Sequence, residues 1–309
     1  MNEVVQVLHL SKQFTDIKAV DDLTFSVSKG EVYGFLGQNG AGKSTTIRML
    51  LTLIKASSGS IRLFGKDLHS HRHEILKQVG AIIEKPDLYK YLTALENLRM
   101  MAQLSGFHPT RKQLIIQLAK VGIAERADSK VNTYSQGMKQ RLGIACALVH
   151  DPQLIILDEP TNGLDPLGIA DVRNLILHLS REEGKTVFVS SHLLSEIELI
   201  ADSMLIIDKG RKIVEGKVSD LLDPADTLVE IETLNDLQTM QLIQQSQWQR
   251  FVQSYGTITL KMHREEIPEL TKFLIENNVA LLSIRSVHSL ENYFLSLTTA
   301  NRHVAAYKN

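Results

Sequence analysis

The chain has 309 residues, 43% of them hydrophobic, which is enough for one large or two modest globular domains, each with its own core. Its formal net charge is −1 and its pI is about 6.8, so it has no basic field to hold nucleic acid or an anionic membrane surface. Cys146 is the only cysteine, which excludes an internal disulfide. It lies in an apolar run, which favours a buried small hydrophobe over a nucleophile.

No targeting or membrane-spanning segment is evident in the sequence. The first residues lack the apolar core of a signal peptide, and no apolar run approaches the ~18 residues that a spanning helix requires. We therefore expect a cytoplasmic protein.

The first part of the chain alternates strand-like runs with a glycine-rich segment. Strands are expected at residues 4–10, 23–27, 31–36, 60–64 and 79–83. The run at 31–36 is apolar, β-branched and aromatic, which is typical of a buried strand, and an amphipathic helix is expected to run from Ser44 to residue 53. The order is strand, glycine-rich loop, helix.

The loop between this strand and helix fits the pattern G-x-x-x-x-G-K-[ST]. Its residues are Gly37, Gln38, Asn39, Gly40, Ala41, Gly42, Lys43, Ser44 and Thr45. The glycines let backbone N–H groups turn toward an anion, the helix N-terminus adds a positive dipole end, and Lys43 adds a mobile charge. An ordinary glycine-rich turn is the alternative, which the flanking strand and helix disfavour. The loop therefore predicts binding of nucleotide phosphates.

Further along, a helical block interrupts the sheet before strands return. Helices are expected at residues 94 to about 124, 136–149, 167–182 and 193–200, and strands at 154–157, 186–190, 204–208 and 211–215. Alternating strands and helices favour a mostly parallel sheet. After Gly216 the composition shifts toward Gln, Asn and Thr, and a small α+β region is expected, with strands at 227–232, 257–262 and 280–287 and a helix at 265–277.

Two adjacent carboxylates, Asp158 and Glu159, follow the apolar run 154–157. Ligands collect at the carboxyl edge of parallel strands, so Asp158 is placed to hold a nucleotide-bound Mg²⁺ together with the hydroxyl of Ser44. Glu159 would face the γ-phosphate, where a carboxylate can orient or deprotonate water. In isolation the pair could simply cap the turn at Pro160, but the phosphate loop upstream favours the metal site.

The segment 134–141 opens the helix that precedes this strand. Ser135 is a good helix-capping residue, and the amides around Gly137 point outward at a positive helix end, so the segment could receive a phosphate. Seen alone, it is a capped helix.

Together, these motifs and their order resemble the nucleotide-binding subunit of ATP-binding cassette (ABC) transporters over about residues 4–216. The resemblance implies an α/β fold of the P-loop NTPase, ABC type. It has a RecA-like, mostly parallel core sheet with an antiparallel β subdomain and a helical subdomain at about residues 87–150. The domains would be residues 1–216, the nucleotide-binding domain, and 217–309, an α+β accessory extension.

The resemblance also implies ATP hydrolysis with ATP and Mg²⁺ as cofactors. Two subunits, in this case two copies of the chain, would face head to tail. Each ATP would lie between the phosphate loop of one subunit and Ser135, Gln136 and Gly137 of the other. Gln136 and Met138 depart from the commoner glycine and glutamine, while Ser135 and Gly137 are retained. We expect the ATP contact to survive this departure.

Other positions follow from the same resemblance. Phe14 falls where an aromatic ring stacks on adenine, with Val20 beside it, although a loop or core aromatic is the plainer interpretation of Phe14. Segment 162–165 matches the loop that crosses the dimer interface. His192 matches the histidine that contacts the γ-phosphate, so the catalytic residues would be Lys43, Glu159 and His192.

Glu84 occupies a position where the family usually has a glutamine that joins Mg²⁺, water and the membrane partner. A carboxylate there can ligate Mg²⁺ but cannot donate a hydrogen bond when ionised. The resemblance implies an integral-membrane permease subunit docking near residues 84–98, where Tyr89 and Tyr91 lie. The chain would then lie on the cytoplasmic face of the cell membrane, held there by the permease.

Segments 84–89, 161–166 and 289–295 resemble the export-type branch that includes bacitracin and lantibiotic resistance or immunity transporters. The cargo would be an antimicrobial peptide, drug or other amphiphile. Two alternatives are a soluble ABC ATPase that clamps nucleic acid and a regulatory module that binds ATP without hydrolysing it. The single cassette without a basic tract disfavours the first, and Glu159 with His192 disfavours the second.

Two other features are given plain interpretations. His69, His71 and His73 alternate and could bind zinc, but without an acidic or sulfur ligand beside them they favour a solvated loop. Trp248 is interpreted as a packing residue rather than a ligand platform.

Overall fold

The computed structural model contains two compact units, Met1–Lys217 and Val218–Asn309. The structure describes residues 3–221, 227–254 and 258–287, so the segment 289–295 lies outside the described residues. Among the described residues, no helix is both long enough and apolar enough to cross a membrane. The two units are described separately below.

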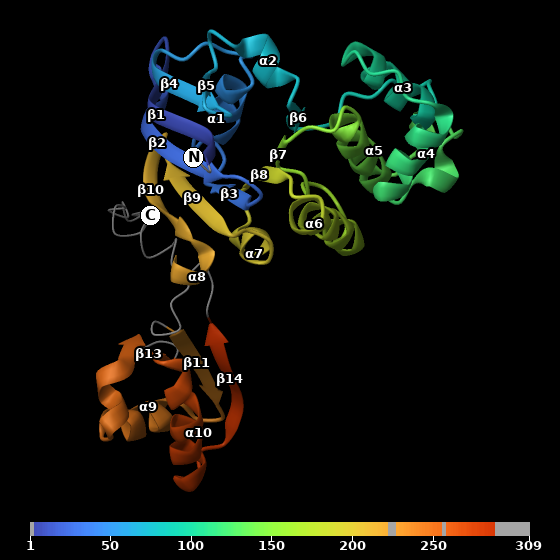
Figure 1. Cartoon of the computed structure of the whole chain (residues 1–309). Helices are drawn as coiled ribbons and strands as arrows, with labels where there is room; N and C mark the ends of the chain where they lie inside the picture. The colour runs from blue at the N-terminus through green and yellow to red at the C-terminus, as the bar shows by residue number, and fades with distance from the viewer. Residues whose placement is uncertain (1–2, 222–226, 255–257, 288–309) are drawn as a thin grey trace, which may run out of the picture. The chain divides into compact units, whose positions relative to one another are not determined.

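A six-stranded sheet forms the centre of the first unit, in the order β10-β9-β3-β8-β7-β6 (Figure 1). The strands are β3 (Val32–Leu36), β6 (Val79–Ile82), β7 (Leu154–Asp158), β8 (Thr186–Ser191), β9 (Ser203–Asp208) and β10 (Arg211–Lys217). All neighbours pair in parallel except β10 with β9. Strands β3, β7 and β8 are buried at every residue, which explains the apolar runs in their interiors. The carboxyl ends of β3, β7 and β8 therefore share one edge.

A second, antiparallel sheet has the order β2-β1-β4-β5. It contains β1 (Glu3–Phe14), β2 (Ile17–Ser28), β4 (Ser58–Leu63) and β5 (Lys66–Asp67). Strands β1 and β2 are longer than expected because their polar ends pair with each other, Phe14 opposite Ile17. Phe25 of β2 stacks on Tyr33 and Phe35 of β3, with ring centroids 6.0 and 5.9 Å apart, so the two sheets share a core.

The helices of the first unit form two groups. Those near the sheets are α1 (Lys43–Leu50), α2 (Arg72–Leu76), α6 (Pro166–Arg181) and α7 (Leu194–Glu198). The others, α3 (Ala94–Leu104), α4 (Arg111–Lys120) and α5 (Gln136–Leu148), pack on one another, and α5 also contacts β6 (Figure 1). The block expected from 94 to 124 is two helices, since Thr110 forms a capping box with Gln113 and begins a new helix. Short 3₁₀ turns at Ala124–Arg126 and Val131–Thr133 lead into α5.

The second unit has a β-α-β-β-α-β order. It begins with the short helix α8 (Val218–Leu221) and contains β11 (Thr227–Thr233), α9 (Asp236–Gln244), β12 (Val252–Ser254), β13 (Ile258–Met262), α10 (Ile267–Glu276) and β14 (Leu281–Val287), with 3₁₀ turns at Gln247–Phe251 and Arg264–Glu266. The antiparallel order β12-β13-β11-β14 is ferredoxin-like. Trp248 is 3% exposed in its core beside Phe251 and Phe273, so it is a packing residue. The predicted α/β class is confirmed, while α9 and β12 were not expected.

Candidate active site

The phosphate loop connects β3 to α1, and its glycines are required by its shape. Gly40 and Gly42 have φ of 82° and 108°, values that residues with a Cβ rarely adopt. A Cβ on Gly42 would lie 2.5 Å from the carbonyl oxygen of Ala19, and one on Gly37 would lie 2.6 Å from that of Ile207. The loop therefore packs too closely against neighbouring backbone to accept a side chain at Gly37 or Gly42.

The loop is braced by residues that the sequence did not single out. The Gly210 N–H, in the turn between β9 and β10, donates to the carbonyl of Ala41 at 2.9 Å, and the Gly210 carbonyl accepts from the Asp21 N–H at 2.9 Å. The Thr46 hydroxyl donates to the carbonyl of Gly42 at 3.0 Å. Only the turn-forming residue type of Gly210 could have suggested such a role.

Three polar side chains, those of Lys43, Glu159 and His192, meet beside the loop from separate elements. Lys43 is 6% exposed, and its Nζ donates to the carbonyl of Gly37 at 2.6 Å and lies 3.1 Å from Glu159 Oε1. Glu159 Oε2 lies 2.7 Å from Nδ1 of His192. The predicted catalytic residues are thus brought together by α1 and by the carboxyl ends of β7 and β8, with the carboxylate between the two cationic or proton-donating groups.

Asp158, the last residue of β7, is completely buried. Its Oδ1 accepts a hydrogen bond of 2.5 Å from Ser190 Oγ, whereas its Oδ2 is buried without a hydrogen-bond partner. A buried, unpartnered carboxylate oxygen is costly unless a cation satisfies it, so this donor set fits Mg²⁺. Ser44 lies half-buried in the first turn of α1, which contacts β7.

Glu84 lies two residues after β6, with φ of 58° and an exposed side chain. Its Oε1 pairs at 2.6 Å with the Arg48 guanidinium on α1. The next residues are fixed at a second point, because buried Asn97 accepts from the Tyr89 N–H at 2.9 Å and donates to the Tyr89 carbonyl at 3.0 Å. Tyr89 and Tyr91 themselves are 57% and 83% exposed.

Other predicted binding residues lie apart from the charged group. Ser135 caps α5 by accepting from the Met138 N–H at 3.2 Å, and it is exposed together with Gln136. Gly137 beside them is half-buried, so this end of α5 lies at the surface of the first unit.

The two residues expected near adenine differ in exposure. Phe14 is 45% exposed, with the Lys12 ammonium 4.9 Å from its ring centroid. Val20 is fully buried, and its Cγ2 lies 3.5 Å from the position that a Cβ on Gly42 would take. Phe14 therefore offers a free ring surface, while Val20 packs against the phosphate loop.

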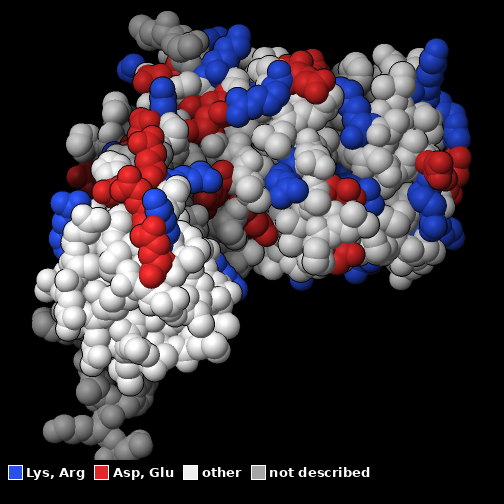
Figure 2. Space-filling model, turned by 90° about the horizontal axis from the view of Figure 1, so that it is seen from below, with Lys and Arg blue, Asp and Glu red and all other residues white. Residues whose placement is uncertain are grey.

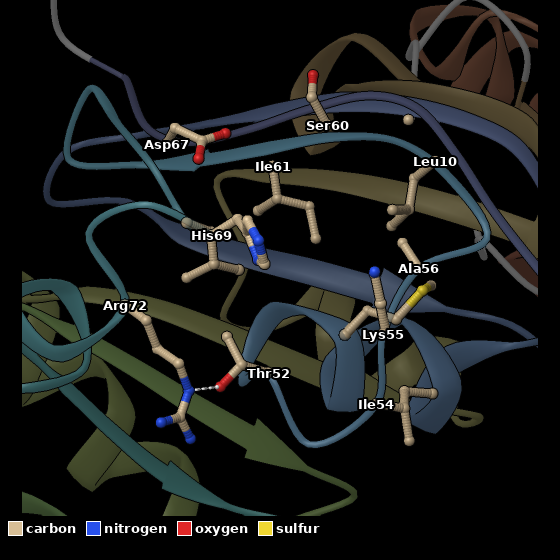
Figure 3. A pocket seen from close by; sticks show the side chains of 13 residues that line it. Leu10, Thr52, Ile54, Lys55, Ala56, Ser60, Ile61, Asp67, His69 and Arg72 are labelled. Atoms are coloured by element: carbon tan, nitrogen blue, oxygen red, sulfur yellow. Dashed lines mark hydrogen bonds between the residues drawn. The ribbon is translucent and has the colours of Figure 1, made fainter.

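Other features of the molecule lie outside this site. A cavity of about 520 Å³ is lined by residues such as Ile61, His69 and Arg72, and none of the predicted site residues lines it (Figure 3). His69, His71 and His73 are exposed, and within the described ranges no group of three His, Cys, Asp or Glu side chains could hold a metal ion. Burial raises the pKa of the Cys146 thiol to about 12, which keeps it protonated and unreactive. Basic and acidic side chains are interspersed on the face drawn in Figure 2.

Comparison with known sequences agrees with this geometry. The family profile described as "ABC transporter" matches residues 20–162. The chain is 42% identical over 301 residues to the bacitracin transport ATP-binding protein BcrA of Bacillus licheniformis, covering 96% of this chain and 98% of the relative. It is 40% identical over 212 residues to the lantibiotic transport ATP-binding protein SrtF of Streptococcus pyogenes, covering 69% of this chain and 90% of the relative.

Solved structures show the same fold. CbiO1 from Clostridium perfringens, part of the ABC transporter complex CbiONQ, superimposes with a TM-score of 0.66 at 27% identity, covering 72% of this chain and 91% of that one. The ATP-binding cassette MJ0796, as a dimer in a post-hydrolysis state with ADP and Pi, gives a TM-score of 0.63 at 25% identity. The match covers 69% of this chain and 98% of that one. The phosphate loop, the paired carboxylates and these likenesses lead to one conclusion: the chain belongs to the ATP-binding, ATP-hydrolysing proteins of ABC transporters.

Proposed function

We propose that this ATPase hydrolyses ATP with Glu159 as general base and Lys43 and His192 as phosphate-stabilising groups. The observation that carries the proposal is the position of the Glu159 carboxylate, 3.1 Å from Lys43 Nζ and 2.7 Å from His192 Nδ1. A base in this position can take a proton from water beside the γ-phosphate, while Lys43 and the loop amides stabilise the charge that develops on the phosphate oxygens.

Asp158, Ser44 and Glu84 are the residues that we assign to the metal side of the site. Asp158 Oδ2 is the best supported of these because it is buried and unpartnered. Mg²⁺ bound there would neutralise charge on the phosphates and hold them for in-line attack. Glu84 must leave Arg48 before it can contribute, since the two are paired at 2.6 Å.

The second half of the site is proposed to come from another copy of the chain. The exposed end of α5, with Ser135, Gln136 and Gly137, presents backbone amides at a helix N-terminus, which suits a phosphate. The exposed ring of Phe14 would take the adenine, with Val20 beneath. The loop at 162–165 would cross the interface, and ATP binding would close the dimer while hydrolysis would reopen it.

We further propose that this cycle powers a separate integral-membrane permease that docks near residues 84–98 and holds the chain on the cytoplasmic face of the membrane. Bacitracin and lantibiotic transport in the names of the relatives supports export of an antimicrobial peptide or similar amphiphile. In this assignment residues 1–216 are the nucleotide-binding domain, with the helical subdomain at about 87–150, and residues 217–309 are an accessory domain.

The substitution Glu159→Gln tests the assignment of the base. The amide keeps the size of the side chain but cannot accept a proton, so ATP binding is expected to persist while turnover falls by roughly 10²–10⁴-fold. ATP should then trap a dimer, visible by light scattering after size-exclusion chromatography. Glu182→Gln, on an exposed carboxylate at the end of α6, is the matched control and should hydrolyse ATP normally. Unchanged steady-state hydrolysis by Glu159→Gln would contradict the proposal.

A further inference from the structure

Ser190, in the last part of β8, contacts both acidic residues of the site. Strands β7 and β8 pair in parallel with Asp158 directly beside Ser190, and Ser190 is completely buried. Its hydroxyl donates to Asp158 Oδ1 at 2.5 Å and accepts from the Glu159 backbone N–H at 3.0 Å. One side-chain oxygen thus bridges the residue assigned to the metal and the residue assigned as base.

The first of these bonds distinguishes the two oxygens of Asp158. Oδ1 is tied to the Ser190 hydroxyl, and Oδ2 is left buried without a partner. A carboxylate held by one oxygen has a fixed plane, so its second oxygen is presented in one direction. This is the role that hydrogen-bonded supports have for metal-ligating carboxylates.

The second bond holds Glu159 in an unusual backbone conformation. Its φ is 51°, in the left-handed region that non-glycine residues seldom occupy. Its N–H is held by Ser190 through both the hydroxyl, at 3.0 Å, and the carbonyl oxygen, at 3.2 Å. Because φ sets where the Cβ points, these bonds help to direct the Glu159 carboxylate to its place between Lys43 and His192.

We propose that Ser190 is a positioning residue that aims Asp158 Oδ2 at the metal and the Glu159 carboxylate at the reacting water. This inference rests on the roles assigned to Asp158 and Glu159 above. Ser190 does not itself need to contact nucleotide. Its effect is transmitted through the hydroxyl alone, since the carbonyl contact to Glu159 is independent of the side chain.

The test compares Ser190→Ala and Ser190→Thr in the full chain. Mn²⁺ is added with a non-hydrolysable ATP analogue, and bound Mn²⁺ is measured by electron paramagnetic resonance. Ser190→Ala loses a hydrogen bond to a charged group, so we expect Mn²⁺ affinity and kcat each to fall roughly 10-fold, with ATP affinity in EDTA changed less than about 2-fold. Ser190→Thr keeps a hydroxyl on a strand-favouring residue and should restore most of both.

Ser180→Ala is the matched control, because Ser180 is also buried and its hydroxyl donates to the Gly30 carbonyl at 2.8 Å, outside the site. It should leave Mn²⁺ affinity and kcat unchanged. Wild-type Mn²⁺ affinity and turnover in Ser190→Ala would overturn the inference, as would Ser190→Thr failing as badly as Ser190→Ala while its thermal midpoint stays at the wild-type value. If Glu159→Gln is inactive and Ser190→Ala is normal, only the inference about Ser190 fails, whereas an active Glu159→Gln contradicts the assigned base.

Discussion

Gly40 and Gly42 share a left-handed backbone but have different surroundings. Gly40, with φ of 82°, has no atom within 4 Å of the position that a Cβ would take, whereas at Gly42 the Ala19 carbonyl oxygen would be 2.5 Å away. A side chain at Gly40 would therefore meet only backbone strain, about 1–2 kcal/mol, while one at Gly42 would also force the loop away from Ala19. Comparing substitutions at these two glycines therefore distinguishes the cost of backbone strain from the cost of a steric clash.

We therefore expect Gly42→Ala to destabilise the chain more than Gly40→Ala does. Thermal unfolding without nucleotide is the measurement, with a fall of several degrees expected for Gly42→Ala and about half that or less for Gly40→Ala. Nucleotide affinity should fall with Gly42→Ala because the phosphate-binding amides move. Equal midpoints for the two variants would show that the contact with Ala19 carries no cost.

The residues assigned to the candidate site differ in how far the sequence alone could point to them. Lys43, Asp158 and Glu159 follow from short local patterns, a glycine-rich loop and an apolar strand that ends in acid. Ser190 and Gly210 could not be found in this way, because their roles depend on the alignment of β8 beside β7 and on the packing of the β9–β10 turn against Ala41. Register and turn packing are settled by the whole sheet, not by neighbours in sequence.

Among the elements, the segment before α3 shows how one side chain can fix an irregular stretch. Asn97 of α3 is fully buried and bonds both the N–H and the carbonyl of Tyr89, as well as the carbonyl of Thr93 at 2.9 Å. The two carbonyls also accept from backbone N–H groups, of Leu92 and of Asn97 itself, so the side chain of Asn97 matters most as the acceptor for the Tyr89 N–H. The proposed permease-docking residues are thus held to the helical group by Asn97 and to α1 by Glu84 and Arg48.

Asn97→Ala is expected to release this stretch. Leaving the partly buried N–H of Tyr89 without its side-chain acceptor should cost about 1–3 kcal/mol of stability, and the amides of residues 87–92 should exchange hydrogen faster by roughly one to two orders of magnitude. Hydrogen–deuterium exchange with mass spectrometry measures the second effect directly. Asn132→Ala, on an exposed side chain in the 3₁₀ turn before α5, is a suitable control, and equal protection in both variants would refute the role of Asn97.

Elements were predicted well where their residues are buried and apolar. They were predicted poorly where they are held by contacts with segments distant in the sequence. Strands β3, β7, β8 and β9 were found because their interiors are almost wholly apolar. The outer end of β1 was missed because Ser11, Lys12 and Gln13 carry no strand pattern. They are held by pairing with β2 and by contacts with Ser57 and Ser58 at the start of β4. Helix α9 was missed for a similar reason, since its glutamines and threonine obscure the apolar stripe formed by Met240 and Ile243.

For the molecule as a whole, each unit has its own apolar core. One cluster lies within residues 4–207 and another within residues 229–284. All the predicted site residues belong to the first unit. A unit with its own core can fold without the rest of the chain.

A chain of residues 1–217 is therefore expected to fold cooperatively and to bind ATP within about 3-fold of the affinity of the full chain. Isothermal titration calorimetry at equal protein concentration, with the full chain in parallel, provides the comparison. Loss of cooperative unfolding in the shorter chain would show that the second unit supplies part of the stability of the first.

The strand order of the central sheet has a consequence for folding during synthesis. Strand β3, which carries the phosphate loop, lies between β8 and β9, and the loop is braced by Gly210, so partners that follow it by about 150 to 170 positions must all be synthesised first. Such long-range pairing closes late in folding. A nascent chain on the ribosome would thus contain the complete glycine-rich motif long before it could bind a nucleotide. ATP could therefore stabilise the chain only after most of the first unit had been synthesised.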